Sequence, residues 1–292
     1  HRRVPLPPAR MVTYTSSSRG GAVVEERCPE IGQPAGNEVT VKGYVPASDE
    51  PTARKLEIAL LLLSRSAAIS EPRITLLAPE DWAEAWKQYF SPQHIGRHTV
   101  IVPTWHAYDP APGEVIIHLD PGMAFGTGLH ASTRLCLIAI EQHLQPGMRV
   151  LDVGTGSGIL SIAAALQGAA EIDAIDIDAV SVRVAADNAA LNGVQDRIHV
   201  ARGTVGGAGH HDVPRHAGRD YDLVLANILA EVIVELAPGL SAALRPGGTF
   251  VGSGIISERA ETVEAALRAV GLAPVAREHE GDWVALVARK GA

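Results

Sequence analysis

The segment VLDVGTGSG, residues 150–158, decides the fold of this chain. Its first part has the apolar character of a buried strand, and an apolar helical pattern begins directly after it. Between them stand alternate glycines, which permit unusual backbone angles and let a ligand approach the main chain closely. A strand, a glycine turn and a helix in this order predict a ligand-binding loop at the carboxyl end of a parallel strand.

The spacing of the glycines limits what this loop can bind. Gly154, Gly156 and Gly158 form a Gly-x-Gly-x-Gly pattern. Dinucleotide-binding folds instead carry Gly-x-Gly-x-x-Gly and place a pyrophosphate on the helix N-terminus. Asp152 adds a carboxylate within the strand that leads into the turn. A negative charge at this place suits a ligand that carries an ammonium and a sulfonium group.

A second carboxylate supports this interpretation. Asp176 ends the strand expected at 172–175, about twenty residues after the loop, where ribose-binding carboxylates stand in such folds. Its two oxygens can accept hydrogen bonds from both ribose hydroxyls. Asp178 is expected to cap the next helix instead. The loop and Asp176 together favour a nucleoside-containing ligand over a simple tight turn.

Strands and helices alternate on both sides of the loop. The expected strands are 149–153, 172–175, 198–201, 221–226 and 249–251, and the expected helices are 158–166, 180–191, 231–244 and 258–270. Near the C-terminus, segments 274–278 and 283–288 are joined by Gly281 and Asp282, which predicts a hairpin. This alternation requires a mostly parallel sheet with helices on both faces, so the fold class is α/β.

The N-terminal part of the chain has a different pattern. Residues 1–37 are rich in Pro, Ser, Gly and Arg without sustained periodicity, and we interpret them as a poorly ordered or variable segment. Residues 38–105 are expected to form a small α/β domain, and residues 106–118 a linker, which leaves 119–292 for the catalytic domain. The small domain's expected elements are strands 39–45, 74–77 and 99–102 and helices 52–67 and 81–90.

Composition places this 292-residue chain among ordinary globular proteins, with 46% hydrophobic and 20% charged residues. The apolar run around 58–63 is too short to span a bilayer, so no membrane association is expected. Cys28 and Cys136 have no partners at metal-binding spacing, which argues against a disulfide framework or a metal site and fits a reducing cytoplasm.

Charge is distributed unevenly along the chain. Residues 1–110 carry 12 Lys and Arg and 12 Asp and Glu, so the net charge of −8 belongs to the rest of the chain. An acidic catalytic part disfavours direct nucleic-acid binding. It suits a basic protein partner, although acidic surfaces also serve solubility alone.

Two further motifs make the chain resemble one family. Residues 119–133 read LDPGMAFGTGLHAST, and residues 227–230, at the end of a predicted strand, read NILA. Together with the glycine loop, these motifs resemble those of bacterial methyltransferases of large-subunit ribosomal protein eleven. The resemblance covers about residues 39–290. It implies a Rossmann-like class I methyltransferase sheet with an antiparallel last strand, a small N-terminal α/β domain that recognises the protein substrate, and S-adenosylmethionine as the cofactor.

The resemblance also implies site residues. The family's cofactor contacts carry over to Thr133, Gly154, Asp176 and Asn227. We add Asp152, Gly156 and Gly158 of the loop to the expected cofactor site.

Some positions depart from the family pattern or have two readings. Thr155 replaces the usual Cys, whose side chain is not the contact. Leu129 and the Ala-Ser pair at 131–132 also differ, which affects the substrate side more than the cofactor side. Phe125 is expected to line the methyl-transfer channel, with a core position as the alternative. His130 either orients this segment or lies at the surface.

Methyl transfer from a sulfonium is an in-line displacement, so alignment is the main task and no metal is required. The accepting amine must be neutral, whereas free Lys titrates near pH ~10.4. A nearby sulfonium charge and desolvation both favour the neutral form. Asn227 can accept the amine's hydrogens without being a strong base; the alternative is that it merely caps the helix near 231. Because Ile228, Leu229 and Ala230 provide no aromatic wall, an aliphatic amine is favoured.

We therefore expect a cytoplasmic, monomeric N-methyltransferase that acts on Lys side chains and the N-terminal amine of large-subunit ribosomal protein eleven. Three alternatives remain open. A methyltransferase of the same fold could act on another protein, on glutamine or on a small-molecule amine. A nicotinamide-dependent oxidoreductase is disfavoured by the glycine spacing. A cofactor-binding module without turnover is disfavoured by the intact Thr133, Asp176 and Asn227.

Overall fold

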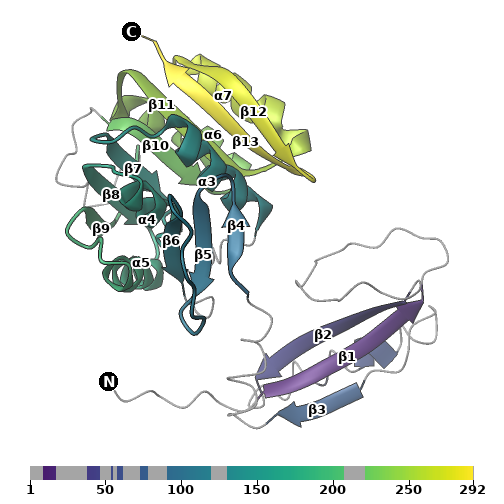
Figure 1. Cartoon of the computed structure of the whole chain (residues 1–292). Coiled ribbons are helices and arrows are strands. Elements are labelled where there is room, and N and C mark those ends of the chain that lie inside the picture. Colours follow the sequence, from purple (N-terminus) through teal and green to yellow (C-terminus); the bar gives the residue numbers. More distant parts are fainter. Residues whose placement is uncertain are drawn as a thin grey trace. The chain divides into compact units, whose positions relative to one another are not determined.

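The computed structural model describes residues 9–17, 38–46, 54, 58–61, 73–77, 91–119, 130–206 and 221–291. The chain divides into two compact units, His1–Ser91 and Pro92–Ala292. The first unit contains a three-stranded antiparallel sheet in the order β2-β1-β3 (Figure 1). Its strands are β1 (Ala9–Ser17), β2 (Glu38–Pro46) and β3 (Arg73–Leu77).

Strand β1 corrects the interpretation of residues 1–37 as a poorly ordered or variable segment for residues 9–17 alone, because the rest of that segment lies outside the described residues. It pairs along its whole length with β2, from Ala9 opposite Pro46 to Ser17 opposite Glu38. The centre of β1 reads VTYT, and β-branched and aromatic residues favour strands. The Pro- and Arg-rich flanks hid this short signal. Strands β2 and β3 confirm two of the predicted elements, and the predicted helix 81–90 lies outside the described residues.

The second unit begins earlier than expected, with a small sheet in the order β4-β5-β6. Its strands are β4 (Gln93–Ile95), β5 (Thr99–Pro103) and β6 (Val115–Leu119), and β6 pairs with β5 in parallel. Strand β6 therefore occupies part of the predicted linker 106–118, and the structure places β5 in the catalytic unit. The reason is tertiary: every residue of β5 is buried, and Asn192 hydrogen-bonds both the N–H and the C=O of His118, at 2.8 Å each.

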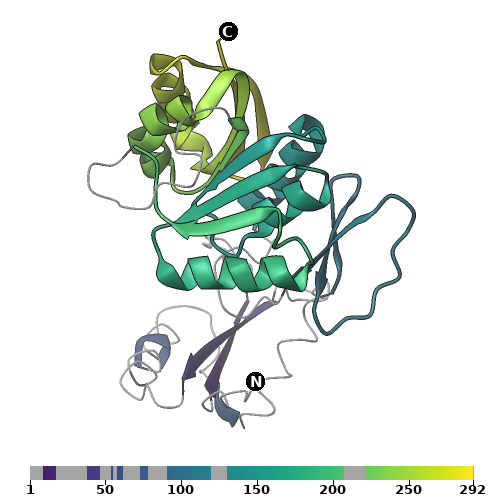
Figure 2. The same cartoon turned by 90° about the vertical axis from the view of Figure 1, so that its left-hand side faces the viewer.

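The main sheet has seven strands in the order β12-β13-β11-β10-β7-β8-β9 (Figures 1 and 2). Neighbours from β11 to β9 are parallel, and β13 is antiparallel to both β11 and β12, which confirms the predicted antiparallel last strand. The strands are β7 (Arg149–Val153), β8 (Glu171–Asp176), β9 (Ile198–Arg202), β10 (Tyr221–Asn227), β11 (Leu244–Ile256), β12 (Leu272–Glu280) and β13 (Trp283–Lys290).

Helices cover both faces of this sheet, as predicted. They are α3 (Ala131–His143), α4 (Ile159–Leu166), α5 (Ala179–Leu191), α6 (Ala230–Ala243) and α7 (Ala260–Ala269), with a 3-10 turn η2 (Ser257–Arg259) before α7. One core joins α3, α4 and α5 to residues such as Val150 and Leu225, and the other joins α6 and α7 to residues such as Leu151 and Val224. Alternate residues of each strand thus enter opposite cores.

Helix α3 was not predicted from the sequence. Its central residues 135–140 are almost uniformly apolar and mostly buried, so they carry no helical periodicity. This helix lies against β11, β12 and β13 and against the small sheet at β4. Its position matters because Thr133, one of the expected cofactor contacts, lies in its first turn. Among the described residues, no helix is both long and apolar enough to cross a membrane.

Candidate active site

The glycine loop connects β7 to α4 in the predicted manner. Gly154, Gly156 and Gly158 have φ values of +73°, +56° and +82°, which residues other than glycine rarely adopt. The N–H groups of Gly154 and Thr155 both donate to the carbonyl of Ile175 at the end of β8, at 2.8 and 3.0 Å. The loop is therefore fixed to the neighbouring parallel strand.

Asp176 fastens the loop from the end of β8. Its Oδ2 accepts the N–H of Gly156 at 3.0 Å, and its Oδ1 accepts the N–H of Asp178 at 2.9 Å. Each carboxylate oxygen can accept more than one hydrogen bond, so both retain capacity for a ligand hydroxyl. Asp178 caps α5 by accepting the N–H of Val180 at 3.0 Å, as predicted. The neighbouring Ile177 is 62% exposed and offers an apolar surface beside this carboxylate.

Asp152 lies beneath the loop and is fully buried. Its Oδ2 accepts the hydroxyls of Thr155 and Ser161, both at 2.7 Å. Burial raises the pKa of this carboxyl, while the two hydroxyl hydrogen bonds act in the opposite direction. Its Oδ1 has no hydrogen-bond partner within the described residues. The Thr155 side chain, which the sequence indicated was not a contact, thus holds Asp152 in place.

Asn227 and Thr133 meet at the same edge of the sheet although they are far apart in the sequence. The side-chain N–H of Asn227, the last residue of β10, donates to the Thr133 hydroxyl at 3.1 Å. The alternative role of Asn227 as a helix cap is wrong, because α6 begins after Leu229 and has no side-chain cap. The amide oxygen of Asn227 is chemically able to accept hydrogens from an amine.

The residue after Asn227 brings the two motifs together. A Cβ atom on Gly154 would lie 2.4 Å from Cγ2 of Ile228, so the glycine loop packs directly against the NILA segment. Leu229 follows with 66% of its surface exposed. Gly154, Asp176 and Asn227 therefore belong to one region at the carboxyl ends of β7, β8 and β10.

Sequence reasoning missed one residue that shapes the loop. The Asn188 side chain in α5 donates to the carbonyl of Ser157 at 2.8 Å, and it is buried. A polar residue on the inner face of the predicted helix 180–191 was the available signal. Phe125, the predicted channel residue, lies outside the described residues. The part of the chain that the structure describes holds no group of three or more His, Cys, Asp or Glu side chains suited to a metal ion.

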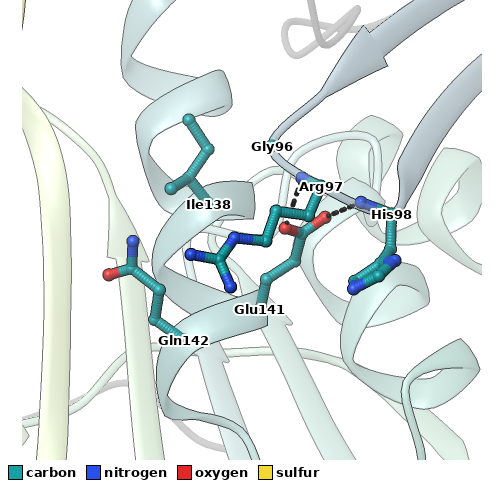
Figure 3. Close-up of a pocket in the computed structure, with 6 residues that line it drawn as sticks. All are labelled: Gly96, Arg97, His98, Ile138, Glu141 and Gln142. Atoms are coloured by element: carbon teal, nitrogen blue, oxygen red, sulfur yellow. Dashed lines mark hydrogen bonds between the residues drawn. The ribbon is translucent and has the colours of Figure 1, made fainter.

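A separate cavity of about 400 Å³ lies between α3 and the turn that joins β4 to β5 (Figure 3). The Glu141 carboxylate accepts the backbone N–H groups of Arg97, His98 and Thr99 at 2.8, 3.0 and 2.8 Å, and the Thr99 hydroxyl at 2.7 Å. Partial burial raises the pKa of Glu141, but these hydrogen bonds outweigh it and lower the pKa overall. The cavity's lining includes no residue of the glycine loop, so Glu141 anchors the small sheet rather than the candidate site.

Comparisons with known proteins agree with this geometry. The family model described as ribosomal protein L11 methyltransferase (PrmA) matches residues 9–291. The ribosomal protein L11 methyltransferase of Chloroflexus aurantiacus is 44% identical in an alignment that covers 93% of this chain and 90% of that protein. The protein of the same name from Pelotomaculum thermopropionicum is 46% identical over 253 residues, which cover 85% of this chain and 79% of that protein.

A solved structure supports the same assignment. The crystal structure of a ribosomal protein L11 methylase from Lactobacillus delbrueckii subsp. bulgaricus matches 70% of this chain and 100% of its own, with 36% identity and a TM-score of 0.61. The family model, the curated relatives and this structure carry the same description. This chain belongs to the ribosomal protein L11 methyltransferase family.

Proposed function

We propose that this chain transfers methyl groups from S-adenosylmethionine to amino groups of ribosomal protein L11, on Lys side chains and on the N-terminal amine. The observation that carries the proposal is the contact between the glycine loop and the NILA segment, at Gly154 and Ile228. This contact brings the expected cofactor loop beside Asn227, the expected contact of the amine. The names of the relatives support the protein substrate.

The described residues fit S-adenosylmethionine. Asp176 has acceptor capacity for ribose hydroxyls, and exposed Ile177 beside it offers an apolar surface to a base. Gly156 carries no side chain that would obstruct a ligand at the loop. Asp152 lies beneath the loop, where its buried carboxyl holds Thr155. When bound, the cofactor supplies an electrophilic methyl group on a positively charged sulfur.

The residues around Asn227 orient the accepting amine. The Asn227 amide oxygen can accept a hydrogen bond from the amine and, because it carries no negative charge, it does not favour the ammonium form as a carboxylate would. Its amide N–H is already bonded to Thr133, which fixes the orientation of the side chain. Exposed Leu229 gives the methylene chain of a lysine an apolar surface to lie along. No aromatic residue stands at 228–230 to stack a flat amide or base. Phe125 is proposed to line the channel through which the methyl group passes.

The remaining expectations complete the proposal. The N-terminal unit recognises L11, and the net charge of −8 in the catalytic part favours a Lys-rich partner over nucleic acid. We place the enzyme in the cytoplasm as a monomer. The proposed role of the N-terminal unit and the proposed preference for a basic partner both require that L11 is the substrate.

The proposal is tested by incubating the full chain with labelled S-adenosylmethionine and purified L11, followed by mass spectrometry of L11. Whole-methylene mass gains on Lys residues or on the N-terminal amine are expected. Asp176→Ala, for which much weaker cofactor binding is expected, serves as the control. If L11 gains no mass while calorimetry detects cofactor binding, the protein substrate is wrong and another protein, glutamine or a small-molecule amine must be sought. If the cofactor does not bind at all, the proposed chemistry is wrong.

A further inference from the structure

The first turn of α3 is held by a part of the chain that is remote in sequence. His130 is the N-cap of this helix, and its Nδ1 accepts the N–H of Ser132 at 3.3 Å and lies 2.7 Å from the Ser132 hydroxyl oxygen. Thr133 follows, with its hydroxyl bonded to Asn227. The N–H groups of Thr133 and Arg134 donate to the His130 carbonyl at 3.0 and 3.1 Å, and the first turn has no acidic residue. The geometry of this turn therefore depends on the position of His130.

The tip of the β12–β13 hairpin supplies that packing. The Trp283 ring meets the His130 ring edge to face, with centroids 4.4 Å apart and planes at 73°. Glu280 forms an ion pair with Arg134, whose Nε donates to its carboxylate at 3.2 Å. Glu280 and Trp283 are paired with each other on either side of the hairpin turn. The two contacts fall on His130 and Arg134, one on each side of Thr133.

The hairpin tip is itself firmly attached to the sheet. The carbonyl of Asp282 accepts both the N–H and the hydroxyl of Ser257, at 2.8 and 3.1 Å. The carbonyl of Val284 accepts the buried Ser253 hydroxyl at 2.9 Å. Ile256 of β11 is opposite Trp283 in the antiparallel ladder. A contact from this tip can therefore impose a position on the helix.

We propose that Trp283 and Glu280 are positioning residues for methyl transfer, because they fix the first turn of α3 and so direct Thr133 toward Asn227. The inference rests on the proposed function, since it assigns these residues to the same site. Neither residue belongs to the glycine loop or to the NILA segment. The two contacts brace the turn from both sides, as a precise site requires of its supporting residues.

The protonation of His130 agrees with this role. Partial burial lowers the pKa of His130, and the positive charge of Arg134 lowers it further. The imidazole is therefore kept neutral, which leaves Nδ1 able to accept the Ser132 N–H. Glu280, which faces Arg134 from β12, offsets part of that positive charge.

The test compares Trp283→Ala, Trp283→Phe and Glu280→Gln in the full chain. Arg277→Gln is the matched control, because Arg277 lies on the same strand as Glu280 but pairs with Glu264 of α7, at 3.8 Å. Calorimetry gives the Kd for S-adenosylmethionine, and the labelled assay gives kcat and the KM for L11. Hydrogen exchange of the amides at 132–135, measured without cofactor, reports on the helix turn itself.

Trp283→Ala is expected to weaken cofactor binding roughly threefold to tenfold, from the loss of one aromatic pair. Faster exchange at 132–135 and an unchanged KM for L11 should accompany it. Trp283→Phe should restore most of the affinity, Glu280→Gln should give a smaller loss, and Arg277→Gln none.

The inference is overturned if Trp283→Ala remains folded with wild-type exchange at 132–135. It is also overturned if Trp283→Phe loses as much affinity as Trp283→Ala, since then the ring contact is not what matters. A wild-type chain that binds no cofactor contradicts the proposed function instead, and the exchange measurement still decides whether Trp283 fixes the helix turn.

Discussion

The parallel strands of the seven-stranded sheet carry polar residues at both of their ends, and these residues are bonded differently at the two ends. We call the side of the sheet where β7, β8 and β10 end the carboxyl edge, and the side where they begin the amino edge. At the carboxyl edge, the partners of Asp176 within the described residues are backbone N–H groups, so its oxygens keep capacity for a ligand. At the amino edge, side chains mostly bond to one another. There the Tyr221 hydroxyl donates to Asp173 at 2.5 Å, with both residues buried, and the Arg245 guanidinium donates to Asp222 at 2.5 Å. Arg149 links these two pairs, because its N–H donates to Asp222 at 2.8 Å and its guanidinium lies 5.5 Å from the centre of the Tyr221 ring. We call Asp173, Tyr221, Asp222 and Arg245 the amino-edge network.

The difference separates binding from stability. Polar groups that satisfy each other hold a fold together but present nothing to a ligand, whereas groups fixed by the backbone can face outward with spare acceptors. Burial and the hydrogen bond to Asp173 both raise the pKa of Tyr221, so this hydroxyl remains a donor at every ordinary pH. Substitutions at the carboxyl edge should therefore change binding or turnover, and those in the amino-edge network should change stability alone.

The largest effect is expected for Asp176→Ala. Asp176 is proposed to accept both ribose hydroxyls, and it fastens Gly156. Its removal should weaken S-adenosylmethionine binding at least roughly hundredfold, because hydrogen bonds to charged groups are each worth about 1.5–3 kcal/mol. Calorimetric titration of wild type and variant gives the comparison. Equal affinity in the two proteins would remove Asp176 from the cofactor site.

Asn227→Ala should separate binding from turnover. We expect cofactor affinity to stay within about threefold of wild type, while kcat falls roughly tenfold to hundredfold because the amine loses an orienting acceptor, which costs a few kcal/mol at most. Single-turnover methylation of L11 and calorimetry on the same preparation provide the two numbers. A variant with full kcat would show that Asn227 does not orient the amine.

Tyr221→Phe tests the amino edge. The buried Asp173 carboxylate loses its donor, which should lower the free energy of unfolding by about 1–3 kcal/mol. Urea denaturation measures this loss, and calorimetry should give an unchanged Kd for the cofactor. The separation of the two edges fails if binding weakens as much as in the Asp176 variant.

The smallest effect is expected from Asp222→Asn. Partial burial raises the pKa of Asp222, but hydrogen bonds from the Arg149 N–H and from Arg245 outweigh it and lower the pKa overall. A lowered pKa in the folded state adds stability above the ordinary value of 3.8, and this stability is lost as the pH falls further. The variant should be less stable than wild type by about 1 kcal/mol or less at pH 7.

The difference between Asp222→Asn and wild type should shrink as the pH falls below 3.8, toward the lowered pKa of Asp222. Urea denaturation of both proteins between neutral pH and pH ~3 measures it. A difference that grows as the pH falls would contradict the assigned direction of the shift.

Much of the carboxyl edge could be predicted because its signals are local. The glycine spacing and the strand before it define the loop without knowledge of the rest of the fold. The position of Asp176 beside the loop was predicted correctly because its place at the end of the next strand follows from βαβ geometry. Asp178 was predicted as a cap because capping involves residues that are close in the sequence.

The parts that were missed depend on contacts between distant residues. Helix α3 has too uniform an apolar run to reveal its period, and strand β6 is held by Asn192, the C-cap of α5. In the sequence, Trp283 and Glu280 are ordinary residues of a predicted hairpin, and nothing near them indicates their contacts with His130 and Arg134. Strand β1 was overlooked because the Pro- and Arg-rich residues around it masked a short run of strand-forming residues.

The most direct test of the proposed site is a crystal structure of the full chain with S-adenosylmethionine bound. We predict that the ribose hydroxyls lie within hydrogen-bond distance of the Asp176 carboxylate and that the methyl group points toward Asn227, with the amino-edge network unchanged. A ribose bound elsewhere, or a methyl group directed away from Asn227, would contradict the assignment of the carboxyl edge as the site of methyl transfer.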